Sequence, residues 1–189
     1  MLQRSTVWIM ALTGGLVVAN NYYNQPLLVE FAHTFGVTEK AVGPVAALTQ
    51  FGYAFGMLVF LPLSDMFERK RMIRLLILAA IGALVATALS PSIHWLIVAG
   101  FMVGFTCVVP QLVTPFAAQL ADPKERGSVV GIVMGGLLTG ILLSRTIAGF
   151  VGAHLGWQAM YWIAAGMMLV LFFVLGRTLP QGLPTFQGS

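Results

Sequence analysis

Hydrophobic residues in this chain fall into six long runs, separated by short stretches that carry charges, glycine or proline. We expect helices over these runs, at about 7–32, 41–63, 72–90, 94–120, 128–152 and 159–176. About 20 apolar residues let a helix cross the hydrocarbon of a bilayer, and each run comes close to that length or exceeds it. Turn signals such as Ser90, Pro91 and Ser92 separate the runs. The pattern therefore predicts six membrane-spanning helices.

The composition excludes a soluble domain. Hydrophobic residues make up 58% of the 189 positions and charged residues only 8%, whereas a soluble domain normally carries about a quarter charged residues. So few charges could not cover so much apolar surface in water. The fold class is therefore an all-α membrane protein, and residues 177–189, beyond the last run, are expected to form a cytoplasmic tail.

Lysine and arginine residues are distributed unevenly between the two ends of the predicted helices. If both termini are cytoplasmic, the cytoplasmic segments hold Arg4, Arg69, Lys70, Arg71, Arg74, Lys124, Arg126 and Arg177, the outer segments hold Lys40, and Arg145 lies within a span. An excess of basic residues marks the cytoplasmic side of a membrane protein. We therefore expect both termini in the cytoplasm. Because the charges lie in short loops, the lipid bilayer is the expected partner and nucleic acid is not.

The first run contains a polar stretch that a lipid-facing helix would not tolerate. On a helix, one arc holds Asn20, Asn21, Tyr23 and Asn24, with Gln25 at its edge and Tyr22 roughly opposite. Pro26 favours a kink at Tyr22. An unsatisfied amide in lipid costs several kcal/mol, so the arc must face protein or water. We predict that it lines a solute cavity; the alternative is hydrogen bonding between neighbouring spans.

The fifth run carries an arginine and a ridge of small residues. Arg145 lies about seven residues from the outer end of this run; an arginine inside a membrane costs about 2.5 kcal/mol or more and marks a functional candidate, unless its side chain reaches the interface. Every fourth position is small: Gly136, Gly140, Ser144, Ala148 and Gly152. Such a ridge lets another backbone approach closely, either from a second half of the protein or from within this bundle.

Two loops share a pattern of charges. Asp65 is followed by Glu68, Arg69 and Lys70 at the end of the second run, and Asp122 by Glu125 and Arg126 at the end of the fourth. Exposed ion pairs contribute only about 0–1 kcal/mol, so such clusters can exchange partners at little cost. We predict that Asp65, Arg69, Lys70, Asp122 and Arg126 form a conformational switch.

These features resemble the N-terminal six-helix half of a major facilitator superfamily transporter, in the branch of bacterial drug and sugar efflux permeases. Its loop motif between spans two and three, Gly-x-Leu-Ala-Asp-Arg-x-Gly-Arg-Lys, is matched by Leu63, Asp65, Arg69 and Lys70. A first-span pattern of the branch is fitted by Asn20, Tyr22, Tyr23, Gln25, Pro26, Leu27 and Leu28. Arg145 and Gly149 resemble the antiporter-type motif of the fifth span.

The resemblance implies a fold and a mechanism. Two inverted three-helix repeats would build the half, and solute would bind near the midplane between two halves. Cavity residues would then be Asn20, Tyr23, Asn24, Gln25, Gln50, Gln111 and Arg145, with Gly136, Gly140, Ser144 and Gly149 packing between halves. The family also implies a bacterial inner membrane and coupling of solute efflux to protons, although Gly100 stands near the place of the fourth-span arginine often used for that coupling.

Alternating access needs two bundles that rock about a central site, so we expect transport to require a second half or a homodimer. The alternative is a membrane partner protein or remnant that does not transport. We expect no enzyme activity, because the chain has no His-Glu-x-x-His motif and no Gly-x-Ser-Gly motif with a histidine partner. Cofactors and metals are not expected either, since His33, His94 and His154 lie at separate span ends.

Overall fold

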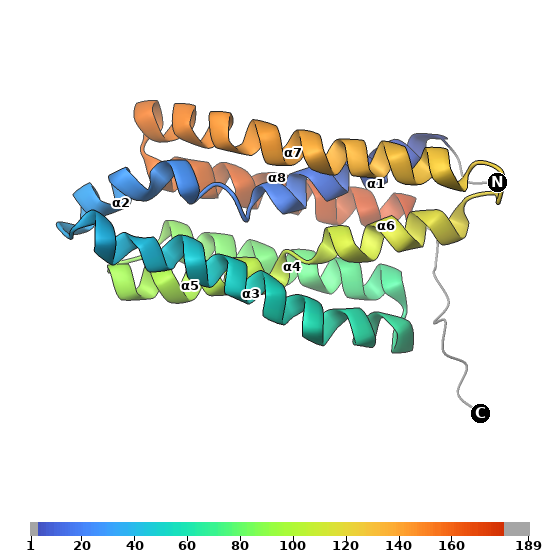
Figure 1. Ribbon diagram of the computed structural model, residues 1–189, viewed down its shortest axis with the longest axis horizontal. Helices are drawn as coiled ribbons and strands as arrows, with labels where there is room; N and C mark the ends of the chain where they lie inside the picture. Colours follow the sequence, from blue (N-terminus) through green and yellow to red (C-terminus); the bar gives the residue numbers. More distant parts are fainter. Residues whose placement is uncertain (1–3, 180–189) are drawn as a thin grey trace.

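The computed structural model describes residues 4–179, apart from the side chain of Asp65, and these residues are almost entirely helical (Figure 1). The elements are α1 (Arg4–Ala19), the 3-10 helix η1 (Gln25–Leu27), α2 (Leu28–Phe35), α3 (Glu39–Met66), α4 (Arg69–Ala88), α5 (Ile93–Thr106), α6 (Val109–Leu120), α7 (Arg126–Leu155) and α8 (Trp157–Thr178). The first predicted run is thus divided among α1, η1 and α2, and the fourth between α5 and α6.

The predicted six-helix membrane bundle is confirmed. Within residues 4–179, five helical stretches are long and apolar enough to cross a membrane, with α5 and α6 counted as one stretch, and the shorter α1 is continued by η1 and α2. Several helices extend past the predicted runs; α7, for example, covers 126–155 where 128–152 was expected. Helix α8 continues through Thr178, and the rest of the predicted tail, residues 180–189, lies outside the described residues.

Short glycine-containing turns connect α2 to α3 and α7 to α8 at one end of the bundle. Gly36 ends α2 with a φ of 61°, and Gly156 joins α7 to α8 with a φ of 82°; both values favour glycine because it has no Cβ. Trp157 then packs edge-on against Phe31, at 5.1 Å between ring centroids, and its indole N–H donates to Thr34 Oγ1 at 3.0 Å. These contacts fix the start of α8 against α2.

The helix pairings have the symmetry of two inverted three-helix repeats. The most extensive contacts join α3 to α5, α1 to α7 and α4 to α8. If the first three spans exchange places with the last three, the first-span pairing α1–α7 becomes the fourth-span pairing α5–α3, and α4–α8 maps onto itself. The two broken spans, α1–α2 and α5–α6, also exchange. The inverted-repeat prediction is therefore confirmed by the packing itself.

Glycines create the two closest crossings, and they occupy equivalent places in the two repeats. A Cβ on Gly15 of α1 would lie 2.6 Å from the carbonyl oxygen of Gly136, and one on Gly140 would overlap the backbone of Gly15. In the α3–α5 crossing, a Cβ on Gly104 would collide with the backbone of α3, and one on Gly52 with the backbone of α5. Each pairing thus depends on backbones that touch.

Two members of the small-residue ridge on α7 have partners within the bundle. Gly136 and Gly140 meet α1, Ser144 is buried, and a Cβ on Gly149 would lie 3.8 Å from the Cβ of Pro26. For Gly136 and Gly140 this is the alternative of packing within the bundle. Contact of the ridge with a second half stays a prediction.

Candidate functional site

The first and fourth spans are both interrupted near the middle of the bundle. After Ala19 the backbone hydrogen bonds join residues three apart instead of four. For example, the N–H of Tyr22 donates to the carbonyl of Ala19 at 3.0 Å. The second interruption falls after Thr106, and Pro110 stands at the start of the helix that follows. Asn20 Nδ2 lies 3.6 Å from Cys107 Sγ, so the two interruptions are in contact.

The amide arc of the first span faces the interior of this bundle. Asn20, Asn21, Tyr23 and Asn24 are 1–3% exposed. Asn24 Nδ2 donates to Thr49 Oγ1 of α3 at 2.8 Å, and Thr49 in turn donates to the carbonyl of Val45 at 2.7 Å. The four residues do share one environment, as the helical arc predicted. In this structure Asn20 and Asn24 bond to neighbouring spans, as in the alternative interpretation, whereas Tyr23 lines a cavity between α1, α7 and α8.

A double-mutant cycle tests the bond between Asn24 and Thr49. Replacing each residue with alanine, singly and together, should give a coupling energy of about 0.6 kcal/mol, with an upper bound of about 1.7 kcal/mol, the range known for hydrogen bonds between membrane helices. Thermal or denaturant unfolding in mild detergent supplies the four stabilities. The matched control pairs Asn24 with Thr87, a buried threonine whose hydroxyl bonds to its own helix at Ala83; that cycle should give no coupling. Equal values in both cycles would contradict the bond.

Arg145 and Tyr22 come together on the other side of the first interruption. The guanidinium carbon of Arg145 lies 5.6 Å from the centroid of the Tyr22 ring, within the range of a cation–π contact. Arg145 is exposed and Tyr22 half-buried. Arg145 lies ten residues before the end of α7, or roughly 15 Å along the helix, so its charge is well inside the span. The ring orients this charge without neutralising it.

A second polar pair extends the site across α3 and α6. Gln111 Nε2 donates to the Tyr53 hydroxyl at 2.8 Å. Gln111 stands one turn after the second interruption, and Tyr53 near the middle of α3. We call Arg145, Tyr22, Tyr53 and Gln111 the polar cluster. Four different spans contribute to it, and both interruptions position its members.

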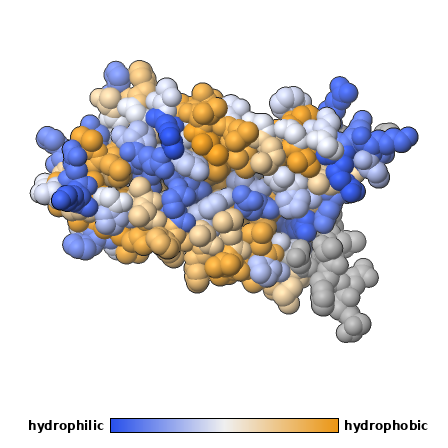
Figure 2. Space-filling model, viewed as in Figure 1, coloured by the Kyte–Doolittle hydropathy of each residue, from blue (hydrophilic) through white to orange (hydrophobic). Residues whose placement is uncertain are grey.

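The polar cluster belongs to the elements that border one face of the bundle. In Figure 1, α7 and α3 lie nearest the viewer along the two edges of this face, with the first span and α6 between them. Figure 2 shows a band of hydrophilic residues crossing the same face, with hydrophobic residues on both sides of it. Gln25 and Gln50, both predicted cavity residues, are half-buried in the first span and in α3.

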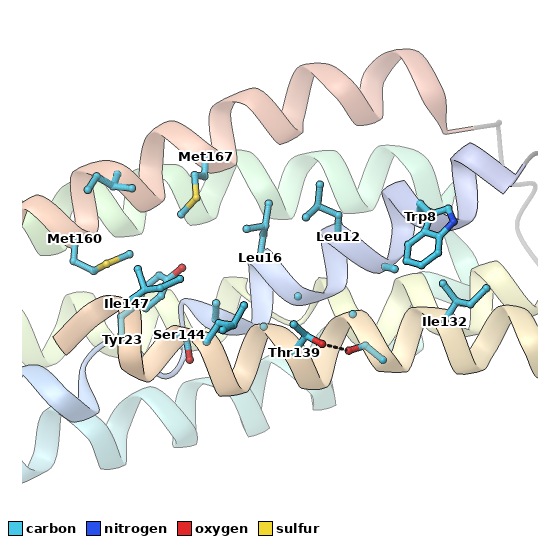
Figure 3. A pocket seen from close by; sticks show the side chains of 18 residues that line it. Trp8, Leu12, Leu16, Tyr23, Ile132, Thr139, Ser144, Ile147, Met160 and Met167 are labelled. Carbon is cyan, nitrogen blue, oxygen red and sulfur yellow. Dashed lines mark hydrogen bonds between the residues drawn. The ribbon is translucent and has the colours of Figure 1, made fainter. Parts of the chain in front are cut away.

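A large cavity of about 620 Å³ between α1, α7 and α8 is a poor candidate for a polar solute. Figure 3 shows its walls, which include Leu12, Leu16, Ile147 and Met167. Two of its three hydroxyl groups are already used: Thr139 donates to the carbonyl of Gly135 at 2.8 Å, and Ser144 to that of Ile141 at 2.7 Å. The third belongs to Tyr23. The cavity therefore offers apolar contact and few free hydrogen-bonding groups.

The predicted switch residues gather at the end of the bundle where α4 begins. Arg69 is 5% exposed and its Nη1 donates to Gln119 Oε1 at 2.9 Å, which links α4 to the end of α6. Lys70 Nζ donates to the carbonyl of Leu179 at 2.6 Å. Asp122 accepts from the backbone N–H of Lys124, and Arg126 is exposed at the start of α7. The side chain of Asp65 lies outside the described residues.

Comparison with known proteins identifies the family. The sequence model of the family named Major Facilitator Superfamily matches residues 10–187 of this chain. The chain belongs to this superfamily. It is 42% identical to the uncharacterized transporter YgaY of Escherichia coli O157:H7 over 95% of this chain and 46% of that protein. It is 29% identical to the 3-(3-hydroxy-phenyl)propionate transporter of Escherichia coli strain K12, over 79% of this chain and 37% of that protein.

Solved structures agree with the fold. The proton:xylose symporter XylE, bound to 6-bromo-6-deoxy-D-glucose, superposes with a TM-score of 0.81 at 16% identity, over 93% of this chain and 44% of that one. The chain thus spans about half the length of the major facilitator superfamily proteins it matches, and it is a multi-pass membrane protein with the fold of one half of such a transporter.

Sequence reasoning missed two members of the polar cluster. Tyr22 was placed opposite the amide arc, and it contacts Arg145 rather than the buried amides. It was therefore left out of the predicted cavity residues. Tyr53 lies three residues after Gln50, on the same side of α3. A polar residue and a tyrosine at this spacing in an otherwise apolar span were the available signal.

Proposed function

We propose that this chain forms one half of a secondary active transporter that moves a small organic solute by alternating access. The observation that carries the proposal is the polar cluster, in which Arg145 holds an unneutralised charge deep in a span beside Tyr22. Intramembrane charge is costly and is retained along substrate pathways. In transporters of this general design, solute binds near the midplane, where discontinuous helices meet.

The chemistry of the polar cluster favours an anionic solute with an aromatic or other planar group. A guanidinium binds carboxylate through paired hydrogen bonds, and Tyr22 and Tyr53 offer ring faces and hydroxyl groups. The name of the 3-(3-hydroxy-phenyl)propionate transporter, a relative at 29% identity, describes a solute of this kind. In its full form, the proposal is that the transporter exports its solute from a bacterial cell in exchange for protons across the inner membrane. Both termini would lie in the cytoplasm.

The complete transporter would consist of this half and a second six-helix half, or of two copies of this chain. The polar cluster would then form one wall of a cavity that the partner completes. Arg69, with its bond to Gln119, would act at the closing end of the cavity, together with Asp65, Lys70, Asp122 and Arg126. The amides Asn20 and Asn24 would hold the interrupted spans in position rather than contact solute.

Reconstitution into liposomes tests the proposal. We would compare the chain alone, as a strict monomer, with the chain co-expressed with the remaining half of the YgaY relative, using labelled 3-phenylpropionate and labelled xylose as probes. Uptake of 3-phenylpropionate above that of xylose is expected only when both halves are present. Flux through the monomer would overturn the need for a partner. Absence of flux in the paired, correctly folded sample and in a dimer would favour a partner protein or remnant that does not transport.

A further inference from the structure

A groove of about 490 Å³ lies between the start of α4 and the end of α8. The part of the groove nearest the start of α4, its upper part, is lined by Lys70, Arg71 and Arg74, with Glu68 as the acidic member. This is the end of the bundle that also carries Arg4, Lys124, Arg126 and Arg177. The groove is thus a cationic recess at the level where a membrane helix begins, between two spans that belong to different repeats.

Arg74 is held in the groove by an aromatic ring, and no ion pair joins it to a carboxylate among the described residues. Its guanidinium carbon lies 4.6 Å from the centroid of the Phe172 ring. Gly176 makes room for it, because a Cβ at that position would lie 3.4 Å from the same carbon. The Nε atom of Arg74 is buried and has no hydrogen-bond acceptor among the described residues. Arg74 as a whole is only half-buried and lines the groove, so the remaining donors of its guanidinium are the ones that an anionic acceptor would meet.

The lower part of the groove is apolar. Leu75 is 57% exposed and Leu78 is 51% exposed, and both lie on the α4 side of the groove, with Phe172 on the α8 side. Cationic groups near the helix end, followed by apolar groups toward the middle of the membrane, match the order of headgroup and acyl chain in a phospholipid. Basic pockets between membrane helices are known to hold such headgroups.

We propose that this groove binds an anionic phospholipid. Its phosphate lies between Arg71 and Arg74, and one acyl chain lies along Leu75, Leu78 and Phe172. Since α4 and α8 are the equivalent third spans of the two repeats, the lipid joins the repeats on the side of the bundle away from the polar cluster. This site is independent of the proposed transport function.

Binding of defined lipids to the full chain tests the proposal. The chain, purified in mild detergent, is titrated with dioleoyl phosphatidylglycerol and with dioleoyl phosphatidylcholine, and bound lipid is counted by native mass spectrometry. Phosphatidylglycerol should bind with one tight site and phosphatidylcholine at least tenfold more weakly. Arg71→Gln and Arg74→Gln should each weaken phosphatidylglycerol about fivefold, the effect expected for one basic residue at an anionic surface. Arg177→Gln, a control at the same end but outside the groove, should bind as the wild type does.

Several results would overturn the proposal. Equal binding of the two lipids would show that headgroup charge is irrelevant, and equal loss in Arg177→Gln would show diffuse attraction. Glycerol 3-phosphate, which has no acyl chain, should bind at least tenfold more weakly than phosphatidylglycerol; comparable binding would indicate a site for free phosphate. Failure of phosphatidylglycerol to bind would show that the groove does not hold an anionic phospholipid. Arg71 is exposed, so its variant remains informative even if Arg74→Gln unfolds.

Discussion

Valine in place of Gly140 is expected to destabilise the bundle by about 1–3 kcal/mol, the usual cost of overpacking a well-packed interior. A Cβ at Gly140 would lie 2.5 Å from the Cα of Gly15, and that atom belongs to backbone, which cannot move as a flexible side chain does. The helices α1 and α7 must therefore separate along one of their most extensive contacts. The midpoint of thermal unfolding in mild detergent measures the effect.

Gly131→Val is the matched control for this experiment. Gly131 lies on the same helix, and a Cβ there would meet nothing within 4 Å. Gly131→Val should change the midpoint of thermal unfolding little. In the α3–α5 crossing, Gly104→Val should behave like Gly140→Val, and Gly82→Val is its control. Equal midpoints for Gly140→Val and Gly131→Val would show that the crossing is looser than the structure indicates.

The six spans could be predicted because the membrane imposes a simple rule: long apolar runs cross it and charges end them. The interruptions were foreseen only in part. Pro26 indicated a kink in the first span, since proline removes a backbone donor. The structure has a longer break after Ala19, because three asparagines close together compete with helical bonding.

The direction of the amide arc could not be predicted from the first span alone. A helical wheel gives the angles between Asn20, Asn24 and Tyr22, and it places the two asparagines on one side and Tyr22 roughly opposite. It does not say which neighbouring helix lies on which side. That information resides in partners such as Thr49 and Cys107, which come from other spans and carry no recognisable motif.

The same limit applies to the small-residue ridge of α7. Its spacing predicts that another backbone approaches closely, and this is what the structure has. Nothing in the ridge names the partner. Its partner, Gly15 of α1, comes from another span, and only the packing of the helices identifies this contact as one within the bundle.

Replacing Arg145 with glutamine should abolish transport of an anionic solute, with at least a tenfold loss in the rate of labelled 3-phenylpropionate uptake by the paired halves. The charge and its paired donors would both be missing. Arg145→Lys keeps the charge but loses the planar fork and should retain part of the activity. Tyr22→Phe preserves the ring that orients the guanidinium, whereas Tyr22→Leu removes it and should cost about twofold to thirtyfold, the range that corresponds to a cation–π contact of 0.5–2 kcal/mol.

Lys40→Gln is the control for Arg145→Gln, because it removes a basic residue that is exposed at the start of α3, whereas Tyr53 of the polar cluster lies near the middle of that helix. Both variants should reach the membrane in equal amounts and show equal unfolding midpoints. If Arg145→Gln transports at the wild-type rate, the guanidinium does not lie on the solute pathway and only reaches toward the interface. If Arg145→Gln fails equally with 3-phenylpropionate and with a neutral solute that the pair transports, the arginine serves the conformational cycle. A selective loss of the anion is the result that assigns Arg145 to recognition of the solute's charge.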